Sequence, residues 1–382
     1  MPATEPRPGR LRATFMRGGT SKGLMVLDED APADARARDS LFAAAMGSPD
    51  PYGRQLNGMG GGVSSLSKVC IVGPPSRPDA DVDYTFGQVL VNEARVDYAG
   101  NCGNMSSAVG PFAVMRGIVK PPGDGYCSIV IHNTNTGKLI RSTFAMAGGE
   151  PRLEGLMQID GVSGSGAPIR LDFLDPGGSK TGKLLPTGQA QDILTATGAE
   201  IRATIIDAAS PCVFVDAADF GMSEPAAPEV IERDAGLMER LERLRCEASV
   251  RAGLAKDLGA AAYLGSVPRI ALVFAAQRQA DLSGRVLDGD AMDITVRMVS
   301  MGKPHRALPI TGAVCLAAAM RIEGATPHRL ARHREGALTI AHPSGLIQVD
   351  ASVIRDAGGM VNVKYGAVYR TARILFDGYV FS

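Results

Sequence analysis

The sequence predicts an α+β protein built from two similar halves, each a rolled β-sheet around one slim central helix. Three observations lead to this prediction. Long stretches alternate apolar and polar residues, short motifs of the first half recur in the second, and two helix-like segments consist almost entirely of small and apolar residues. With 382 residues, the chain is also longer than one ordinary core needs and suits two domains.

Alternation of apolar and polar residues predicts strands over most of the chain, because successive side chains of a strand point to opposite faces. Fewer segments have helical spacing. One helix is predicted over residues 34–46, and a long amphipathic helix over residues 229–258, with an apolar face of Ile231, Leu237, Leu241 and Leu244. The clearest predicted strands lie within residues 81–98, 126–148, 269–276, 292–302 and 365–381.

Two pairs of similar segments relate the halves of the chain. Arg-Ala-Thr begins a predicted strand at residues 12–14 and again at 202–204. The segment AVGPFAVMR at residues 108–116 resembles AVCLAAAMR at 313–321. Both separations are about half of the chain, which indicates an internal duplication. A helix of such small residues can be surrounded closely on all sides, so we expect each half to curl its sheet around one.

The domain boundary is predicted in the segment FLDPGGSKTGKLLPTGQA, which is rich in glycine and carries two prolines. We expect a first domain over residues 10–185 and a second over residues 186–370. The final strand, residues 371–382, is expected to return to the first domain.

Composition limits the class of partner. Forty basic and forty acidic residues cancel, so no overall field attracts nucleic acid or an anionic membrane, and we expect neither as a partner. The six cysteines form no CxxC pair, which favours reduced thiols. Without an apolar leader or an apolar run of about 18 residues, we expect a cytoplasmic protein. The histidines lack metal-ligand spacing, so no metal is predicted. A homodimer is left open.

The sharpest candidate for a functional site is Cys102 in GNCGNMSSAVGPFA. Asn101 or Asn104 can cap the helix that follows, and Gly103 lets backbone amides face an anion. The positive end of a helix also favours a thiolate, so Cys102 could exchange protons. The alternative is a cysteine packed as a small apolar residue. Pro111 predicts a kink or a late start of this helix.

Two further turns in the first half carry anion-binding chemistry. MRGGTSK at residues 16–22 has two glycines and two hydroxyls between Arg17 and Lys22, which would form a nest for a carboxylate or phosphate, or an ordinary hairpin turn. GGGVSSLSKV at residues 60–69 repeats this composition. Its Lys68 could bind an anion, act as a base if buried, or be a solvated surface lysine.

The second half offers two more such segments. GGSKTGK at residues 177–183 fits the GxxxxGK spacing of a nucleotide loop, but Leu184 replaces the hydroxyl residue that holds magnesium, so we expect small carboxylates instead. The contacts would come from Ser179, Lys180 and Thr181. MGKPHRALPITGA places Lys303 and His305 before the second slim helix, Thr311 and Gly312 at its start, and a structural Cys315 inside it.

Together these residues suit a small anion with several carboxylates and proton chemistry on a carbon beside one of them. Backbone amides at a helix start would stabilise an enolate-like intermediate. The sequence alone leaves open which group removes the proton.

The motifs MRGGTSKG, SSLSKV, GNCGNMSSAVGPFA, FLDPGGSKTGKLLPTG and LPITGAVCLAAA closely resemble those of the 2-methylaconitate isomerase family, which also contains 4-oxalomesaconate and 3-methylitaconate isomerases. The resemblance runs from about Arg12 to the C-terminus. It implies the diaminopimelate epimerase-like fold, two pseudo-equivalent domains with a rolled sheet around a central helix. It also implies a 1,3-proton shift in an unsaturated di- or tricarboxylate without metal or organic cofactor.

The resemblance places the family's essential lysine on Lys68 and its cysteine on Cys102. Amino-acid epimerases of this fold carry a second cysteine where this chain has Pro309, so a two-thiol racemase is disfavoured. An alternative without catalysis is an accessory partner of an aconitase-like enzyme. The resemblance places substrate contacts in the GGTSK turn, the CGN helix start and the TGA segment of the second half. Together with the residues argued above, the predicted substrate-binding residues are Arg17, Gly18, Gly19, Thr20, Ser21, Lys22, Ser65, Asn101, Gly103, Asn104, Met105, Ser179, Lys180, Lys303, His305, Thr311 and Gly312.

Overall fold

The computed structural model describes residues 9–98, 101–120, 123–265, 267–355 and 359–381, and the chain divides into two compact units. Unit 1 is Met1–Leu171 with Arg370–Ser382, and unit 2 is Asp172–Tyr369. The division therefore lies before the predicted position at residue 185. Residues 172–185 belong to unit 2 because Asp175 donates its amide to the Lys364 carbonyl and Gly178 donates to that of Asp207.

Unit 1 opens with the hairpin β1–β2, and β3 then runs parallel to β2. β4 returns antiparallel to β3, β6 lies parallel to β4, and β7 forms a hairpin with β6. The last strand, β21, pairs antiparallel with β1. The elements are β1 (Arg10–Gly18), β2 (Ser21–Leu27), α1 (Ala35–Met46), β3 (Lys68–Gly73), β4 (Val82–Val89), β5 (Val96–Asp97), α2 (Gly103–Met115), β6 (Gly125–Asn133), β7 (Lys138–Ala147), β8 (Glu150–Pro151), β21 (Ala372–Phe381) and the first half of β9 (Ile169–Leu174), whose second half belongs to unit 2.

Unit 2 follows the same order. A hairpin, β11–β12, is joined by a parallel β13, and β16 is antiparallel to β13 and parallel to β18. The elements are β10 (Asp192–Leu194), β11 (Ile201–Asp207), β12 (Pro211–Asp216), α3 (Pro228–Arg233), α4 (Ala235–Arg251), α5 (Leu258–Tyr263), β13 (Arg269–Ala275), β14 (Gln279–Ala280), β15 (Val286–Leu287), β16 (Ile294–Ser300), β17 (Lys303–Pro304), α6 (Ile310–Met320), α7 (Thr326–Leu330), β18 (Leu338–His342), β19 (Gly345–Arg355) and β20 (Val361–Arg370).

The shared order confirms the duplication that the sequence predicts. In each unit a short strand, β5 or β17, precedes a central helix, α2 or α6, and a hairpin follows that helix. The two Arg-Ala-Thr segments lie in β1 and β11, the first strands of the two hairpins. The two similar small-residue segments form α2 and α6 and end at their C-caps, Arg116 and Arg321.

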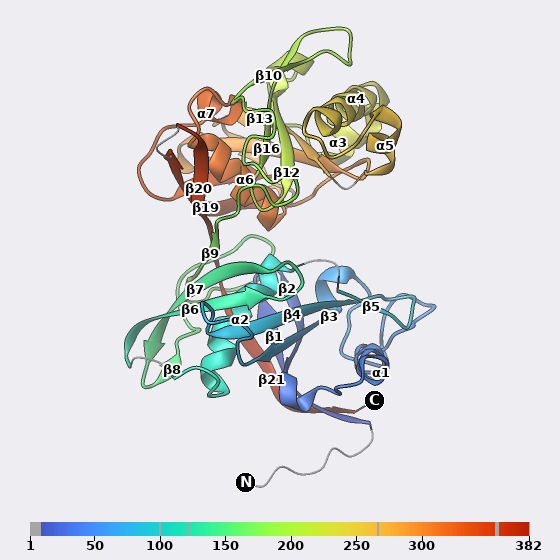
Figure 1. The fold of residues 1–382 in the computed structure, drawn as a ribbon, viewed down its shortest axis with the longest axis vertical. Coiled ribbons are helices and arrows are strands. Elements are labelled where there is room, and N and C mark those ends of the chain that lie inside the picture. The colour runs from blue at the N-terminus through green and yellow to red at the C-terminus, as the bar shows by residue number, and fades with distance from the viewer. Residues whose placement is uncertain (1–8, 99–100, 121–122, 266, 356–358, 382) are drawn as a thin grey trace. The chain divides into compact units, whose positions relative to one another are not determined.

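The central helices are slim because strands of the same unit surround them (Figure 1). In α2 every residue from Met105 to Val114 is buried. A Cβ atom on Gly110 would lie 2.7 Å from the Phe144 ring and 2.7 Å from the Ser142 hydroxyl, so only glycine fits at this point. The helix begins at Gly103 and contains Pro111, so the predicted late start is wrong.

The helix predicted over residues 34–46 is confirmed as α1, with Asp34 as its N-cap. The long helix predicted over residues 229–258 is wrong, because it is divided into α3, α4 and α5. Asp234 ends α3, and its carboxylate caps α4 by accepting the amide of Leu237. The apolar face predicted for this segment nevertheless lies in one buried cluster, which contains Ile231, Leu237, Leu241 and Leu244.

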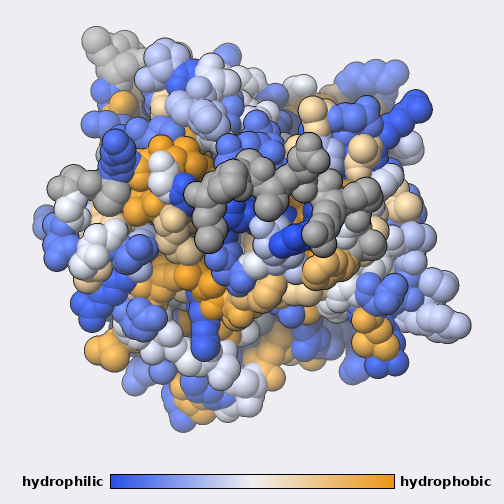
Figure 2. Space-filling view, turned by 90° about the horizontal axis from the view of Figure 1, so that it is seen from below, coloured by the Kyte–Doolittle hydropathy of each residue, from blue (hydrophilic) through white to orange (hydrophobic). Residues whose placement is uncertain are grey.

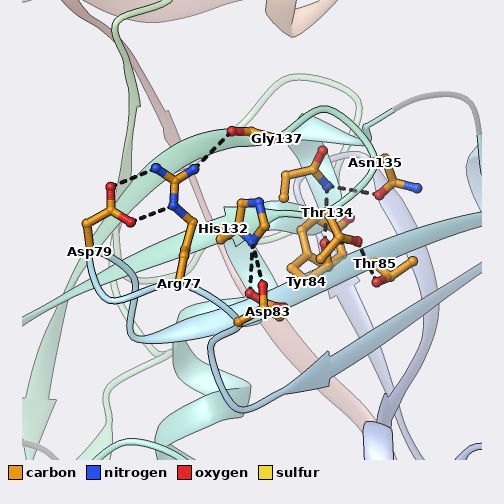
Figure 3. A network of polar contacts seen from close by, with 11 residues as sticks. Arg77, Asp79, Asp83, Tyr84, Thr85, His132, Thr134, Asn135 and Gly137 are labelled. Carbon is orange, nitrogen blue, oxygen red and sulfur yellow. Dashed lines mark hydrogen bonds and ion pairs between the residues drawn. The ribbon is translucent and has the colours of Figure 1, made fainter.

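Polar contacts attach the β6–β7 turn to β4 (Figure 3). His132 Nδ1 lies 2.9 Å from Asp83 Oδ1, and the hydroxyls of Thr85 and Thr134 are 2.6 Å apart. Arg77 pairs with Asp79 and donates to the carbonyl of Gly137. These contacts hold β4 in place, the strand that carries Tyr84 and Gln88 on the face of the candidate site.

Hydrophilic side chains cover much of the molecular face in Figure 2, with hydrophobic residues exposed among them. In the described part of the chain, no helix has both the length and the apolar character needed to cross a membrane.

Candidate active site

Lys68 is the first residue of β3, and its side chain is 7% exposed, so it is not a solvated surface lysine. Its Nζ donates to Oε1 of Gln88 at 2.7 Å and lies 4.9 Å from the centre of the Phe86 ring. Gln88 faces Lys68 directly in the β3–β4 register. The lysine therefore has neutral partners. Ser65 lies half-buried in the preceding turn.

Cys102 is the N-cap residue of α2, and its thiol is half-buried. No side chain of the described residues caps this helix start, so the predicted capping by Asn101 or Asn104 is wrong. The helix start therefore keeps unpaired amides that suit an anion, as at other helix N-termini. A side-chain oxygen of Asn101 is also buried, and no residue in the described part of the chain forms a hydrogen bond with it.

Lys68 and Cys102 both act on the buried Cys70. Burial raises the pKa of the Cys70 thiol, the nearby Cys102 adds to this rise, and Lys68 opposes it. Cys70 Sγ lies 3.8 Å from the hydroxyl of Tyr84, whose pKa is raised mainly by burial and further by the two thiols. The two residues predicted as catalytic are thus brought to the same small region of unit 1.

Asn104 does not cap α2 but connects it to the β1–β2 turn. Its Nδ2 donates to the Thr20 hydroxyl at 3.0 Å, and its Oδ1 accepts the amide of Thr20 at 3.4 Å and Nε of Arg370 at 3.2 Å. A Cβ on Gly19 would collide with Oδ1, and one on Gly18 would lie 3.0 Å from the Cα of Met105. Glycines at these positions let the turn approach the helix start.

The cations of the β1–β2 turn are less available than the sequence suggests. Arg17 Nη1 donates to the carbonyls of Gly19 at 2.9 Å and Thr371 at 3.0 Å, so it holds the turn in shape. Burial lowers the pKa of Arg17, and Arg373 lowers it further. Ser21 is buried, and the ammonium of Lys22 lies 5.4 Å from the Phe15 ring.

Arg370 and Gln88 are residues that sequence reasoning missed. Arg370 is buried, and this burial lowers its pKa to about 10. It comes from the start of the returning C-terminal segment, far along the chain from Asn104. For Gln88, the only local signal of a role in the site was that a polar residue stands within the alternating strand predicted over residues 81–98.

In unit 2, the GGSKTGK turn binds an anion that belongs to the chain itself. The carboxylate of Asp207 accepts the Ser179 hydroxyl at 2.5 Å, the amides of Lys180 and Thr181 at 2.8 Å, and the Thr181 hydroxyl at 2.9 Å. The hydroxyls of Ser179 and Thr181 are therefore occupied by this carboxylate, against their prediction as ligand contacts, whereas Lys180 uses its backbone amide here and a ligand role of its side chain stays a prediction. No helix follows this turn before β10, in line with the rejection of a nucleotide loop.

A second group of predicted residues surrounds the start of α6. Arg269 Nη1 donates to the hydroxyls of Ser210 at 2.8 Å and Thr311 at 3.2 Å. Burial lowers the pKa of His305, and Arg269 adds to this effect. A Cβ on Gly312 would lie 2.8 Å from Met298 Sδ, and Lys303 is exposed. Arg269 was not singled out from the sequence.

Pro309 is the N-cap of α6, the position that Cys102 has in α2. Pro309 and Cys102 are therefore at equivalent N-cap positions of the two central helices. Among the described residues, no group of three His, Cys, Asp or Glu side chains is arranged to hold a metal ion.

Three curated relatives are similar over nearly their whole length. The 3-methylitaconate isomerase of Eubacterium barkeri is 39% identical, with 97% of each chain covered. The 2-methyl-aconitate isomerase of Shewanella oneidensis is 36% identical, covering 97% of this chain and 96% of the relative. The (4E)-oxalomesaconate Delta-isomerase of Novosphingobium sp. is 38% identical, with 100% of each chain covered.

Two solved structures support the predicted fold. The crystal structure of methylitaconate-delta-isomerase matches with a TM-score of 0.90 and 39% identity, covering 97% of this chain and 95% of that one. A hydroxyproline epimerase from Agrobacterium vitis, at 13% identity and a TM-score of 0.51, shares the fold over 98% of this chain and 93% of its own. The diaminopimelate epimerase-like fold is thereby confirmed.

The family model described as PrpF protein matches residues 9–382, almost the entire chain. Together with relatives at 36–39% identity, this confirms the resemblance found in the motifs. The chain belongs to the PrpF protein family.

Proposed function

We propose that this protein is an isomerase of small unsaturated di- or tricarboxylates, with 2-methylaconitate as the first candidate substrate. Isomerase activity follows from the full-length similarity to isomerases of methylaconitate, methylitaconate and oxalomesaconate. The observation that carries the chemistry is the buried Lys68 amine with neutral partners, in the same region of unit 1 as the thiol at the start of α2, since both groups act on Cys70. 4-Oxalomesaconate and 3-methylitaconate are the alternative substrates.

In the proposed reaction, the neutral amine of Lys68 removes a proton from the carbon next to the double bond. The C–H electron pair spreads over three carbons and into the adjacent carboxylate, and the thiol of Cys102 gives a proton to the far carbon. One C–H bond breaks and one forms, so the substrate gains and loses no atoms overall. Proton transfer from the lysine ammonium to the thiolate, directly or through solvent, restores the enzyme.

The start of α2 is proposed to bind the carboxylate that receives the negative charge. Amide groups of residues 103–105 point out of the helix start, and Asn104 with the buried Arg370 lies beside it. These dipoles and the guanidinium favour an enolate more than a neutral acid, so they stabilise the intermediate. For the group of Arg269, Lys303, His305 and Thr311 in unit 2, we propose carboxylate binding as well.

Proton NMR in heavy water tests the function. The panel is 2-methylaconitate, aconitate, 4-oxalomesaconate and 3-methylitaconate, and the substrate is the one whose allylic proton signal disappears fastest. Lys68→Ala and Cys102→Ser should abolish both isomerisation and exchange, while Lys138→Ala and Cys246→Ser at other sites should not. Full activity in both site variants would overturn the proposal. Binding without any carbon–hydrogen exchange would instead indicate an accessory protein.

A further inference from the structure

We infer that Gln88 is a positioning residue for Lys68: it aims the lysine amine and, because it is uncharged, leaves that amine able to lose its proton. The inference rests on the proposed function of Lys68 as the base. It is carried by the hydrogen bonds around the Gln88 amide and by the absence of a carboxylate partner for Lys68 in the described residues.

The orientation of the Gln88 amide is set by its neighbours. Its Nε2 donates to the carbonyls of Ser67 at 2.9 Å and Ser64 at 3.0 Å, with a longer contact of 3.4 Å to the carbonyl of Val89. The opposite orientation would place Oε1 against these carbonyl oxygens and the NH₂ group against the lysine amine. Oε1 therefore faces Lys68, and it accepts the Nζ hydrogen at 2.7 Å.

The strand pairing makes this contact local and rigid. Gln88 and Lys68 are direct partners in the antiparallel β3–β4 register. Phe86 and Tyr84 occupy the same face of β4, two and four residues earlier, so this face lies under both Lys68 and Cys70. On the other side, Gly23 pairs with Lys68 and has no side chain that could push it away.

The charge of the partner decides how readily the amine loses its proton. Within the described residues no acidic side chain forms an ion pair with Lys68, and its Nζ donates its hydrogen bond to a neutral amide. A carboxylate at this distance would stabilise the ammonium form. Among the described titratable groups, the thiol of Cys70 interacts with Lys68, while Cys102 and Tyr84 are neighbours of Cys70, and Gly23 on β2 adds none. An uncharged glutamine does not stabilise the ammonium form in this way, so it is a suitable partner for an amine that acts as a base.

Two substitutions at Gln88 separate its effect on the alignment of the Lys68 amine from the effect of its lack of charge. Gln88→Glu keeps the shape but adds a negative charge, and Gln88→Met removes the hydrogen bond without adding charge. We expect Gln88→Glu to move the acid side of the kcat profile upward by about one pH unit or more, with recovery of activity at high pH. Gln88→Met should lower kcat by roughly tenfold through lost alignment, without that displacement, and with little change in KM. Gln348→Glu, on an exposed position, is the matched control.

A second readout does not depend on turnover. Lysine labelled with ¹³C at Cε reports the titration of each amine by NMR, and the Lys68 signal is the one missing in Lys68→Arg. The inference expects this titration to move upward by about one pH unit or more in Gln88→Glu and not in Gln348→Glu. An unchanged Lys68 titration in a folded Gln88→Glu protein overturns it, whatever the substrate panel shows. Failure of the whole panel with the native chain would instead overturn the proposed function.

Discussion

Lys68 and Arg269 occupy the same position in the two units. Each is the first residue of a strand that runs parallel to the second strand of a hairpin, paired with Gly23 in unit 1 and with Cys212 in unit 2. Each donates to neutral oxygens, of Gln88 in one case and of hydroxyls in the other. The duplication has thus placed one cation at the start of the equivalent strand in each unit, a lysine where proton transfer is proposed and an arginine where only carboxylate binding is proposed.

The slim helix α2 should tolerate no extra methyl group at Gly110. We expect Gly110→Ala to lower the free energy of unfolding by about 1–3 kcal/mol, because its Cβ would lie 2.7 Å from both Phe144 and Ser142. Urea denaturation measures the change. Gly236→Ala, in the first turn of α4 with room for a methyl group, should instead be neutral or stabilising by up to about 1 kcal/mol. Equal effects at the two sites would contradict the packing argument.

Asn104 should matter for binding more than for stability. Asn104→Ala removes the contacts to Thr20 and Arg370, so the β1–β2 turn loses its connection to the start of α2. We expect KM to rise by about tenfold, which corresponds to roughly 1.4 kcal/mol, with a smaller change in kcat. Asn104→Asp keeps the size but adds a negative charge beside the proposed carboxylate, and its KM should rise further. Steady-state kinetics with the substrate found by NMR decides, and an unchanged KM in both variants would contradict this role.

His305 should be neutral at pH 7. Burial and the charge of Arg269 lower its pKa, so its NMR titration midpoint should lie below the ordinary value of 6.5. Because the folded pKa is lowered, the unfolded chain binds a proton first, and this group should reduce stability as the pH falls below 6.5. Arg269→Gln should move the midpoint partly back toward 6.5, and Arg269→Lys should not. A midpoint at or above 6.5 in the native chain would disprove the arrangement.

Asp207 should stabilise the turn at residues 177–183. It is buried and accepts four hydrogen bonds from Ser179, Lys180 and Thr181. Asp207→Asn puts an amide NH₂ group against these donors, so we expect a loss of about 1–3 kcal/mol in unfolding free energy and faster proteolysis within this turn. Asp290→Asn, at a carboxylate that is 87% exposed, should change stability little. Similar losses in the two variants would argue against this assignment.

Much of the fold was predictable because its signals are local. Alternation revealed the strands, and small residues revealed α2 and α6, since a helix inside a rolled sheet must be thin at points such as Gly110. The errors have identifiable causes, one local and one distant in the sequence. The single helix expected over residues 229–258 is divided because Asp234 ends α3 and caps the start of α4. The cap expected at α2 is absent because Asn104 bonds to a turn that lies far away in the sequence.

The sequence by itself determined that this is a duplicated α+β protein of the PrpF family with Lys68 and Cys102 as its candidate reactive groups, because glycines, small residues and cations mark these motifs locally. The tertiary structure decided their surroundings. Strand register put Gln88 opposite Lys68, and the returning C-terminal strand brought Arg370 to Asn104. Neighbours of this kind depend on pairing between distant segments, for which a single sequence contains no local signal.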